Sequence, residues 1–294
     1  MSHRRALALM VLVTLLWSTA GVVTRHLESV RSFELTFWRS AFTAASLVLW
    51  WGVRQGLSGL APLGSPSSRL WLSALCWAVM FTAFMLALTL TTVANVLVVM
   101  ALGPLMTALL AWMVLRRPLP VVTVVAVLLA GGGVAWMFGG QGVDLGWGPL
   151  VALAVPLAAS VNWTLMQAHA GRPIGAEREV SLPHAVALGA ALSAAFTLPA
   201  AWPLQASGHD IAWLAFLGVT QLAIPCVLLV HLTRVLSATE VALVALLELV
   251  FGVAWVWWLA GEVPGPNTLS GASLVVVALV FNELKRPRRT SHAA

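Results

Sequence analysis

The chain has 294 residues, of which 60% are hydrophobic and 9% are charged, and its mean hydropathy is +0.94. A soluble protein of this length needs more charge to cover its surface, so the composition excludes a water-soluble globular domain. The net charge of +6 does not indicate nucleic-acid binding, because the basic residues stand at the ends of apolar segments. Uninterrupted apolar stretches of about 20 residues predict membrane-spanning α-helices, since strands of a membrane barrel would alternate in polarity.

Ten apolar segments follow one another along the chain, joined by connectors too short to form a separate domain. We therefore predict an all-α integral membrane protein with ten transmembrane helices. The predicted helices cover residues 6–24, 34–53, 69–89, 93–115, 119–138, 146–168, 182–203, 211–233, 239–260 and 267–284.

The positions of the basic residues predict how the chain is oriented in the membrane. Cytoplasmic connectors carry an excess of Lys and Arg. With the N-terminus inside, thirteen of the sixteen Lys and Arg residues fall on the cytoplasmic side, two (Arg25 and Arg31) fall opposite, and Arg39 lies within the second segment. This distribution predicts that both termini are cytoplasmic and that the number of spans is even.

The second half of the chain repeats the pattern of the first at an offset of 145 residues. Val96 aligns with Val241, Leu102 with Leu247, and Trp112 with Trp257. The predicted units are a first five-helix repeat over residues 1–145, a second over 146–284, and a basic cytoplasmic tail over 285–294. Because five is an odd number, the second repeat enters the membrane from the opposite side, and such inverted repeats are a recurring transporter architecture. The clusters Gly131-Gly132-Gly133 and Gly271-Ala272 favour close helix packing.

Three tryptophans lie deep within segments, whereas most others stand near segment ends, where interfacial aromatic belts are expected. These three are Trp17, Trp77 and Trp163. At the 145-residue offset Trp17 falls within one residue of Trp163, so we expect the two to face one cavity from opposite halves; ordinary helix packing is the alternative.

Glu248 is the acid nearest the middle of a segment, where a charged carboxylate costs about 2.5–3.5 kcal/mol on insertion scales. It could couple transport to protons, bind a substrate amine, or form a structural hydrogen bond to a neighbouring helix. Arg39 is expected to snorkel outward or to contact Glu34.

Amides and prolines within segments supply further candidates. Asn162 and Gln221 are expected by default to hydrogen-bond between helices, but they could also orient a polar ligand. Pro104, Pro156 and Pro225 each remove a backbone donor and kink a segment; such breaks often surround a substrate path, although simple kinks are equally common.

Chemical motifs of enzymes and pumps are absent from the sequence. It contains no His-Glu-x-x-His, no Cys-x-x-Cys, no phosphate-binding Gly-rich loop and no nucleophile elbow. We therefore expect no metal, no cofactor and no ATP-driven step. Cys76 and Cys226 lie inside apolar segments and are expected to be free thiols.

Several short motifs together resemble the EamA family of the drug/metabolite transporter superfamily. They are Leu16-Trp17-Ser18-Thr19, Arg39 early in the second segment, Leu247-Glu248-Leu249-Val250, the turn Gly261-Glu262, and Gly271-Ala272. The resemblance implies ten spans, a central cavity drawn from segments one, three, four, six, eight and nine, and alternating access. Within the family the chain looks most similar to YddG-type exporters of aromatic and other neutral amino acids. The first repeat departs from the pattern, because Leu102-Gly103-Pro104 lacks a carboxylate and Arg116-Arg117 replaces Gly-Glu.

The expected function is export of small amphipathic metabolites, chiefly amino acids including aromatic ones, across a bacterial inner membrane. The expected partners are a small-molecule substrate and membrane lipid, with neither nucleic acid nor an obligate protein partner. Alternatives are a proton-coupled drug exporter and, from other classes, a lipid-modifying enzyme or a passive channel; a sugar-phosphate carrier is less expected because no Lys lies within a segment. The expected substrate-binding residues are Trp17, Ser18, Trp77, Pro104, Asn162, Trp163, Gln221 and Glu248.

Overall fold

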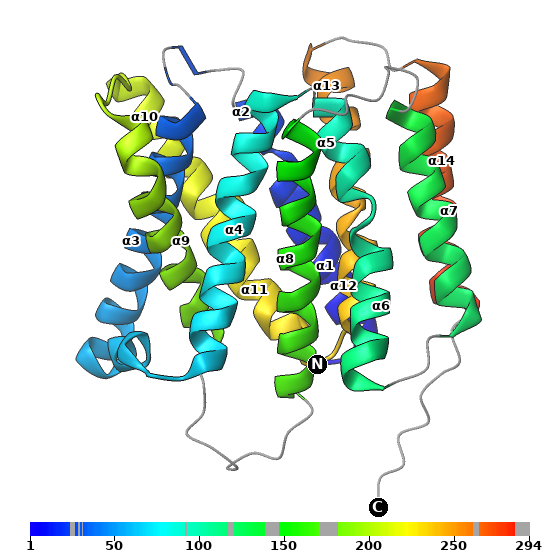
Figure 1. Cartoon of the computed structure of the whole chain (residues 1–294), viewed down its shortest axis with the longest axis horizontal. Coiled ribbons are helices and arrows are strands. Elements are labelled where there is room, and N and C mark those ends of the chain that lie inside the picture. Colours follow the sequence, from blue (N-terminus) through cyan, green and yellow to red (C-terminus); the bar gives the residue numbers. More distant parts are fainter. Residues whose placement is uncertain are drawn as a thin grey trace, which may run out of the picture.

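The computed structural model describes residues 1–23, 27, 28, 30, 32–91, 93–116, 120–138, 147–170, 182–260 and 265–285, and these residues form a bundle of helices (Figure 1). The turns at 117–118 and 261–264 and the tail from 286 onward lie outside the described residues. Within the described ranges the secondary structure is helical throughout, so the all-α fold class is confirmed.

Each predicted segment coincides with one helix or with a few consecutive ones. Six segments are single or nearly single helices: α3 (Ser32–Leu60, followed by the 3₁₀ turn η2, Ala61–Gly64), α4 (Ser68–Leu90), α7 (Val121–Phe138), α8 (Trp147–Ala170), α9 (Leu182–Ala201) and α14 (Pro266–Lys285). Four segments are broken: α1 (His3–Ser18) with α2 (Ala20–Val23); α5 (Val93–Met100) with α6 (Gly103–Leu115); α10 (Gly208–Phe216), the π-helix η4 (Leu217–Ala223) and α11 (Ile224–Leu232); and α12 (Ala238–Ala245) with α13 (Leu247–Ala260).

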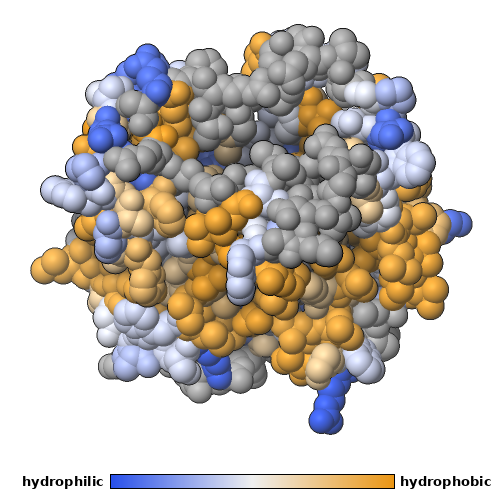
Figure 2. All heavy atoms as spheres, turned by 45° about the horizontal axis from the view of Figure 1, so that its top comes forward, coloured by the Kyte–Doolittle hydropathy of each residue, from blue (hydrophilic) through white to orange (hydrophobic). Residues whose placement is uncertain are grey.

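Membrane-spanning character is supported by length and composition. Six described stretches are long and apolar enough to cross a bilayer: Ser68–Ala87, Val96–Leu115, Trp147–His169, Leu182–Ala201, Gly208–Leu232 and Ala238–Leu259. Two shorter apolar helices cover Val121–Met137 and Pro266–Asn282. Figure 2 shows hydrophobic residues gathered across the middle of one face, with hydrophilic residues toward both ends. The total of ten crossings remains a prediction.

Two of the breaks fall at the same place in the 145-residue pattern. Helix α5 ends at Met100 and helix α12 ends at Ala245, which are 145 positions apart. After each break the backbone makes a tighter bond from residue i to i−3: Leu102 N–H donates to the Val99 carbonyl at 3.1 Å, and Leu246 N–H to the Leu243 carbonyl at 3.2 Å. The first break has a local cause, since Pro104 lacks the N–H that would continue the helical ladder.

Helix packing also recurs at a spacing of five segments. Helix α4 of the third segment packs against α8 and α9, the sixth and seventh; α11 and η4 of the eighth pack correspondingly against α1 and α3, the first and second. In the same way α6 packs on α8, and α13 packs on α1. Figure 1 shows that the first helix begins, and α14 ends, at the same end of the bundle.

Helices α7 and α14 pack closely against each other through glycines at one edge of the bundle (Figure 1). A Cβ on Gly133 would lie 2.8 Å from the Gly271 carbonyl oxygen, so only glycine permits this approach. The close packing predicted for these two glycine-containing clusters is therefore confirmed at Gly133 and Gly271. Cys76 and Cys226 are buried and free, also as predicted.

Candidate functional site

A cavity of about 140 Å³ lies among α1, α3, α4, α5, α6, α8, η4, α11, α12 and α13. Its volume corresponds to roughly ten water-sized groups, on the basis that one water occupies about 10–15 Å³ in the same measure. The cavity draws on all six segments named from the family resemblance and, in addition, on the second segment through Arg39. Six of the eight expected site residues line it: Trp17, Trp77, Pro104, Trp163, Gln221 and Glu248.

One wall of the cavity is aromatic. The ring centroids of Trp77 and Trp163 are 5.3 Å apart with planes at 69°, which is an edge-to-face contact between α4 and α8. Phe81 extends the wall one helical turn along α4, with its centroid 5.5 Å from that of Trp77. Trp17 of α1 also lines the cavity. Edge-to-face pairs favour a fixed geometry, so these rings form a preorganised apolar surface.

A polar group lies on the wall formed by α3 and η4. Nη1 of Arg39 donates to Oε1 of Gln221 at 3.4 Å, and Nε2 of Gln221 donates to the Trp17 carbonyl at 3.3 Å. The Trp17 carbonyl is near the end of α1, where helical carbonyls lack intrahelical partners. Gln221 therefore satisfies the end of α1 and orients Arg39 at the same time.

Gly218 explains why η4 comes so close to α3. A Cβ at Gly218 would lie 2.8 Å from the Arg39 carbonyl oxygen, so any side chain there would push the two helices apart. The hydroxyl of Thr43 lies 2.9 Å from the Gly218 carbonyl oxygen and 2.8 Å from the Arg39 carbonyl oxygen, so its one proton is shared between the two acceptors. The contact to Gly218 supplies a donor to backbone in a π-helical stretch that precedes Pro225, a residue without an N–H.

The structure corrects the expectation for Arg39. Its side chain is 2% exposed and lines the cavity, whereas outward snorkelling or a contact with Glu34 was expected. Glu34 instead accepts the backbone N–H groups of Gln205 and Ala206, both at 2.7 Å, outside the cavity. The physical reason is helical geometry: residues five apart point in different directions, whereas contacts along one face need a spacing of three or four.

Glu248 enters the cavity from the first turn of α13, directly after the break at Leu246. A helix N-terminus carries partial positive charge, which favours a carboxylate there. No described residue hydrogen-bonds or ion-pairs directly with this carboxylate, although it interacts electrostatically with Arg39. Arg39 and Glu248 therefore line the same cavity without forming a salt bridge with each other.

Two proline-containing helices meet beside this site. Pro104 lies in the first turn of α6 and Pro156 lies inside α8, and both line the cavity. The hydroxyl of Ser160 donates to the Pro156 carbonyl at 2.6 Å, and the hydroxyl of Thr107 lies 3.0 Å from that of Ser160. These bonds fix α6 against α8 and bring the Thr107 side chain to the cavity wall.

Ser18 and Asn162 are placed outside the cavity lining. The Ser18 hydroxyl donates to the Leu15 carbonyl at 2.7 Å and accepts from Nε1 of Trp255 at 2.9 Å, which links α1 to α13. Oδ1 of Asn162 accepts from the Ser73 hydroxyl at 2.7 Å, which links α8 to α4. Successive helical residues point about 100° apart, so Asn162 faces α4 while its neighbour Trp163 reaches the cavity.

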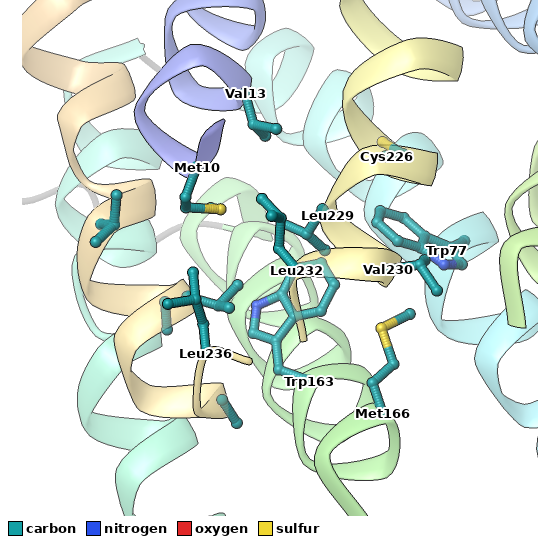
Figure 3. Close-up of a cluster of buried hydrophobic side chains, with 14 of the residues drawn as sticks. Met10, Val13, Trp77, Trp163, Met166, Cys226, Leu229, Val230, Leu232 and Leu236 are labelled. Carbon is teal, nitrogen blue, oxygen red and sulfur yellow. The ribbon is translucent and has the colours of Figure 1, made fainter. Parts of the chain in front are cut away.

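A layer of buried apolar side chains from α1, α8 and α11 packs next to Trp163 and Cys226, which line the cavity (Figure 3). We call it the floor layer, and it consists of the fully or almost fully buried side chains Met10, Val13, Met166, Leu229 and Leu232. Beyond it, Nε2 of His3 lies 3.4 Å from Oε1 of Glu240, and Ala238 N–H donates to Oε1 of Gln167 at 2.8 Å. The start of α1, the end of α8 and the start of α12 are therefore joined.

Comparison with known proteins identifies the group to which this arrangement belongs. A family model described as the EamA-like transporter family matches residues 4–139 and again residues 146–283. The chain belongs to the EamA-like transporter family. This family is part of the drug/metabolite transporter superfamily and consists of membrane transporters.

A solved structure titled only "Crystal structure of protein" shares the fold of this EamA-like chain. Its TM-score is 0.80 at 19% sequence identity, and the match covers 98% of this chain and 100% of the other. No curated protein matches this chain significantly. The EamA domain therefore occurs twice in the chain, once in each half.

Some cavity residues of this EamA-like protein were not identified from the sequence. Phe81 and Phe84 could have been found, since they follow Trp77 at helical spacings of four and seven and therefore share its face. Thr107 carried no such signal. Arg39 was noted as part of the family resemblance but was not among the expected substrate-binding residues. Among the described residues no cluster of three or more His, Cys, Asp and Glu side chains could hold a metal ion.

Proposed function

We propose that this EamA-like protein is a secondary transporter that exports small amphipathic metabolites, chiefly amino acids including aromatic ones, by alternating access. It acts in a bacterial inner membrane with both termini in the cytoplasm and performs no chemistry on its substrate. The observation that carries the proposal is the central cavity, in which an aromatic wall faces a small number of polar side chains.

The aromatic wall suits a substrate with a flat or apolar side chain. The indoles of Trp17, Trp77 and Trp163 offer stacking and edge contacts, which favour ring-bearing groups beyond simple burial of area. Gln221 and Glu248 supply the polar contacts that orient such a ligand. A cavity equivalent to roughly ten water-sized groups is of the size of one amino acid.

The two EamA domains would be related by an inverted repeat. Three observations support this relationship: the same family domain occurs twice, two helix breaks fall 145 residues apart, and the packing pairs recur five segments later. The cavity would then lie at the interface of the repeats, where transporters of this architecture bind substrate.

Alternating access would require the side chains of the floor layer to move apart from one another. The packed, buried side chains of α1, α8 and α11 would form the barrier between the cavity and the end of the bundle where the chain begins. Rocking of the halves would open this route while closing the opposite one. The present conformation would therefore be the one closed toward the cytoplasm.

Flux of radiolabelled amino acids into proteoliposomes tests the proposal. We expect saturable counterflow of phenylalanine and other neutral amino acids, and a strong reduction in Trp163→Ala. Trp258→Ala is the matched control, because this residue lies outside the cavity with 76% of its surface exposed. Absence of counterflow for every amino acid tested would reject amino acids as substrates, and equal flux in the two variants would remove Trp163 from the site.

A proton-coupled drug exporter is the second candidate, favoured by the presence of Glu248 in the cavity. In that case an imposed pH gradient would accelerate transport of an apolar cation, and Glu248→Gln would abolish the acceleration. An enzyme would yield a chemically altered product, detectable by mass spectrometry of the transported compound. A channel would show flux that does not saturate with concentration.

A further inference from the structure

The cavity contains two oppositely charged side chains that do not form a salt bridge with each other. Arg39 comes from α3 and Glu248 from the first turn of α13, and the two line the same space. They interact electrostatically, but no direct ion pair links them in the described part of the chain. Charged groups inside a protein that lack an oppositely charged partner are unfavourable, so such a pair calls for a ligand that satisfies both charges.

Arg39 retains unused hydrogen-bonding capacity. A guanidinium has five N–H donors, and the described contact to Gln221 at 3.4 Å is long for a hydrogen bond. Nε of Arg39 is buried and has no hydrogen-bond partner. With only 2% of the residue exposed, bulk water does not take the place of a partner. A carboxylate entering the cavity would meet a buried cation with free donors, and two parallel bonds to a carboxylate are the geometry that guanidinium favours.

Glu248 provides the opposite pole. Its carboxylate accepts no hydrogen bond from the described residues, and it lies at a helix N-terminus that stabilises negative charge. An ammonium group offers three N–H donors to such an acceptor. Under the 145-residue repeat Glu248 corresponds to Gly103, which also lines the cavity but brings no charge. Among the described residues that line it, the negative charge of the cavity therefore comes only from the second repeat, and the positive charge comes from Arg39. This arrangement favours one orientation of a ligand that carries two opposite charges.

Simple charge matching then decides which ligands fit. An organic anion would pair with Arg39 but would be repelled by Glu248. An organic cation would pair with Glu248 but would be repelled by Arg39. A neutral apolar molecule would leave both charges buried and unpaired, which is the costly outcome. A zwitterion pairs with both groups and leaves the net charge of the occupied cavity unchanged.

Resting on the transport role proposed above, we propose that Arg39 and Glu248 are the specificity-determining pair of the cavity and select α-amino-acid zwitterions. Arg39, held by Gln221, binds the substrate carboxylate, and Glu248 binds its ammonium group. The substrate side chain then lies against the aromatic wall of Trp77, Trp163 and Phe81.

The test is direct binding of three related ligands to the full-length protein in detergent, measured by isothermal titration calorimetry. Phenylalanine carries both charges, phenylalanine amide keeps only the ammonium group, and 3-phenylpropionate keeps only the carboxylate. We expect phenylalanine to bind about 10- to 100-fold more tightly than either analogue, the usual range for a lost hydrogen-bonded charge contact.

Variants of Glu248 and of Arg39 are each expected to change the relative affinities for the three ligands in a different way. Glu248→Gln weakens phenylalanine binding about tenfold but leaves 3-phenylpropionate binding unchanged or tighter, because the repulsive carboxylate is gone. Arg39→Gln is expected to weaken the binding of phenylalanine and to leave the binding of phenylalanine amide unchanged. Matched controls are Glu28→Gln and Arg54→Gln, which remove the same charges from exposed positions outside the cavity.

Separate outcomes reject the inference and the transport role. If the wild type binds the three ligands equally, or if each pole variant weakens all three alike, the charge-selection inference is wrong while amino-acid transport stands. If no amino acid binds or is transported, both fail. Should Arg39→Gln not yield monodisperse protein, Gln221→Leu replaces it; loss of the group that orients Arg39 is then expected to reduce discrimination against the amide.

Discussion

The indole of Trp77 on α4 meets the indole of Trp163 on α8 edge to face, with centroids 5.3 Å apart, and together they form the aromatic wall of the cavity. Trp77 is fully buried and Trp163 is 3% exposed. This contact joins two helices from different EamA domains. It links the stability of the helix pair to the shape of the candidate site.

We predict that the two tryptophans are energetically coupled. In a double-mutant cycle with Trp77→Leu and Trp163→Leu, the coupling free energy should be about 0.5–1.5 kcal/mol, the range for aromatic pairs beyond area burial. Unfolding by sodium dodecyl sulfate in mixed micelles gives the free energies. A cycle between Trp77 and the exposed Trp112 is the control and should be additive; coupling of similar size there would contradict the prediction.

Glycine at position 133 is predicted to be essential for the α7–α14 contact. Gly133→Ala would place a methyl group 2.8 Å from the Gly271 carbonyl oxygen, and overpacking of this kind costs about 1–3 kcal/mol. Gly132→Ala is the matched control, since a Cβ there meets nothing within 4 Å. Thermal unfolding in detergent should show a lower Tm for Gly133→Ala only. A Tm equal in both variants would mean that the two helices separate without cost.

The Thr43 hydroxyl is predicted to stabilise the π-helical stretch that positions Gln221. Thr43→Val removes the donor to the buried Gly218 carbonyl, and an unsatisfied buried acceptor costs about 1–3 kcal/mol. Thr43→Ser keeps the hydroxyl and should be nearly neutral. Unfolding free energies distinguish the two. Equal stability of the Val and Ser variants would show that another group satisfies the carbonyl.

The floor layer is predicted to control access to Cys226, which lines the cavity and is 1% exposed. In a Cys76→Ser background, Leu229→Ala should increase the rate at which a membrane-impermeant maleimide labels Cys226 from the side of the chain termini. Loss of packing volume at a fully buried leucine opens a path for water and reagent.

The control for this labelling experiment is Leu109→Ala, which changes a half-exposed leucine on α6 outside the cavity and should leave the rate unchanged. Vesicles of both orientations establish the side of entry. If Cys226 reacts equally fast in the parent protein and in Leu229→Ala, the layer does not form the barrier.

Much of the architecture could be read from the sequence because membrane helices are locally determined. Lipid requires each spanning segment to be apolar and to satisfy its own backbone polarity, so the apolar runs locate the helices without knowledge of their neighbours. The breaks at Pro104 and before Pro225 also have local causes, since proline lacks a backbone donor. The deep tryptophans Trp17, Trp77 and Trp163 were predicted for the same reason, as position within a segment indicates depth in the bilayer.

The direction in which each polar side chain points was decided only by the tertiary structure. Arg39 was expected to turn away from the centre, yet Gly218 lets η4 approach α3 and places Gln221 within reach of its guanidinium. Asn162 and Ser18 were expected in the site, but Ser73 and Trp255 hold them between helices. The hydropathy of a segment does not reveal which face of the helix a single polar residue occupies. The rotation of the helix about its axis, which decides this, is fixed by how its neighbours pack. Segment positions were therefore determined by local hydrophobicity, whereas the charge pattern of the cavity required the assembled bundle.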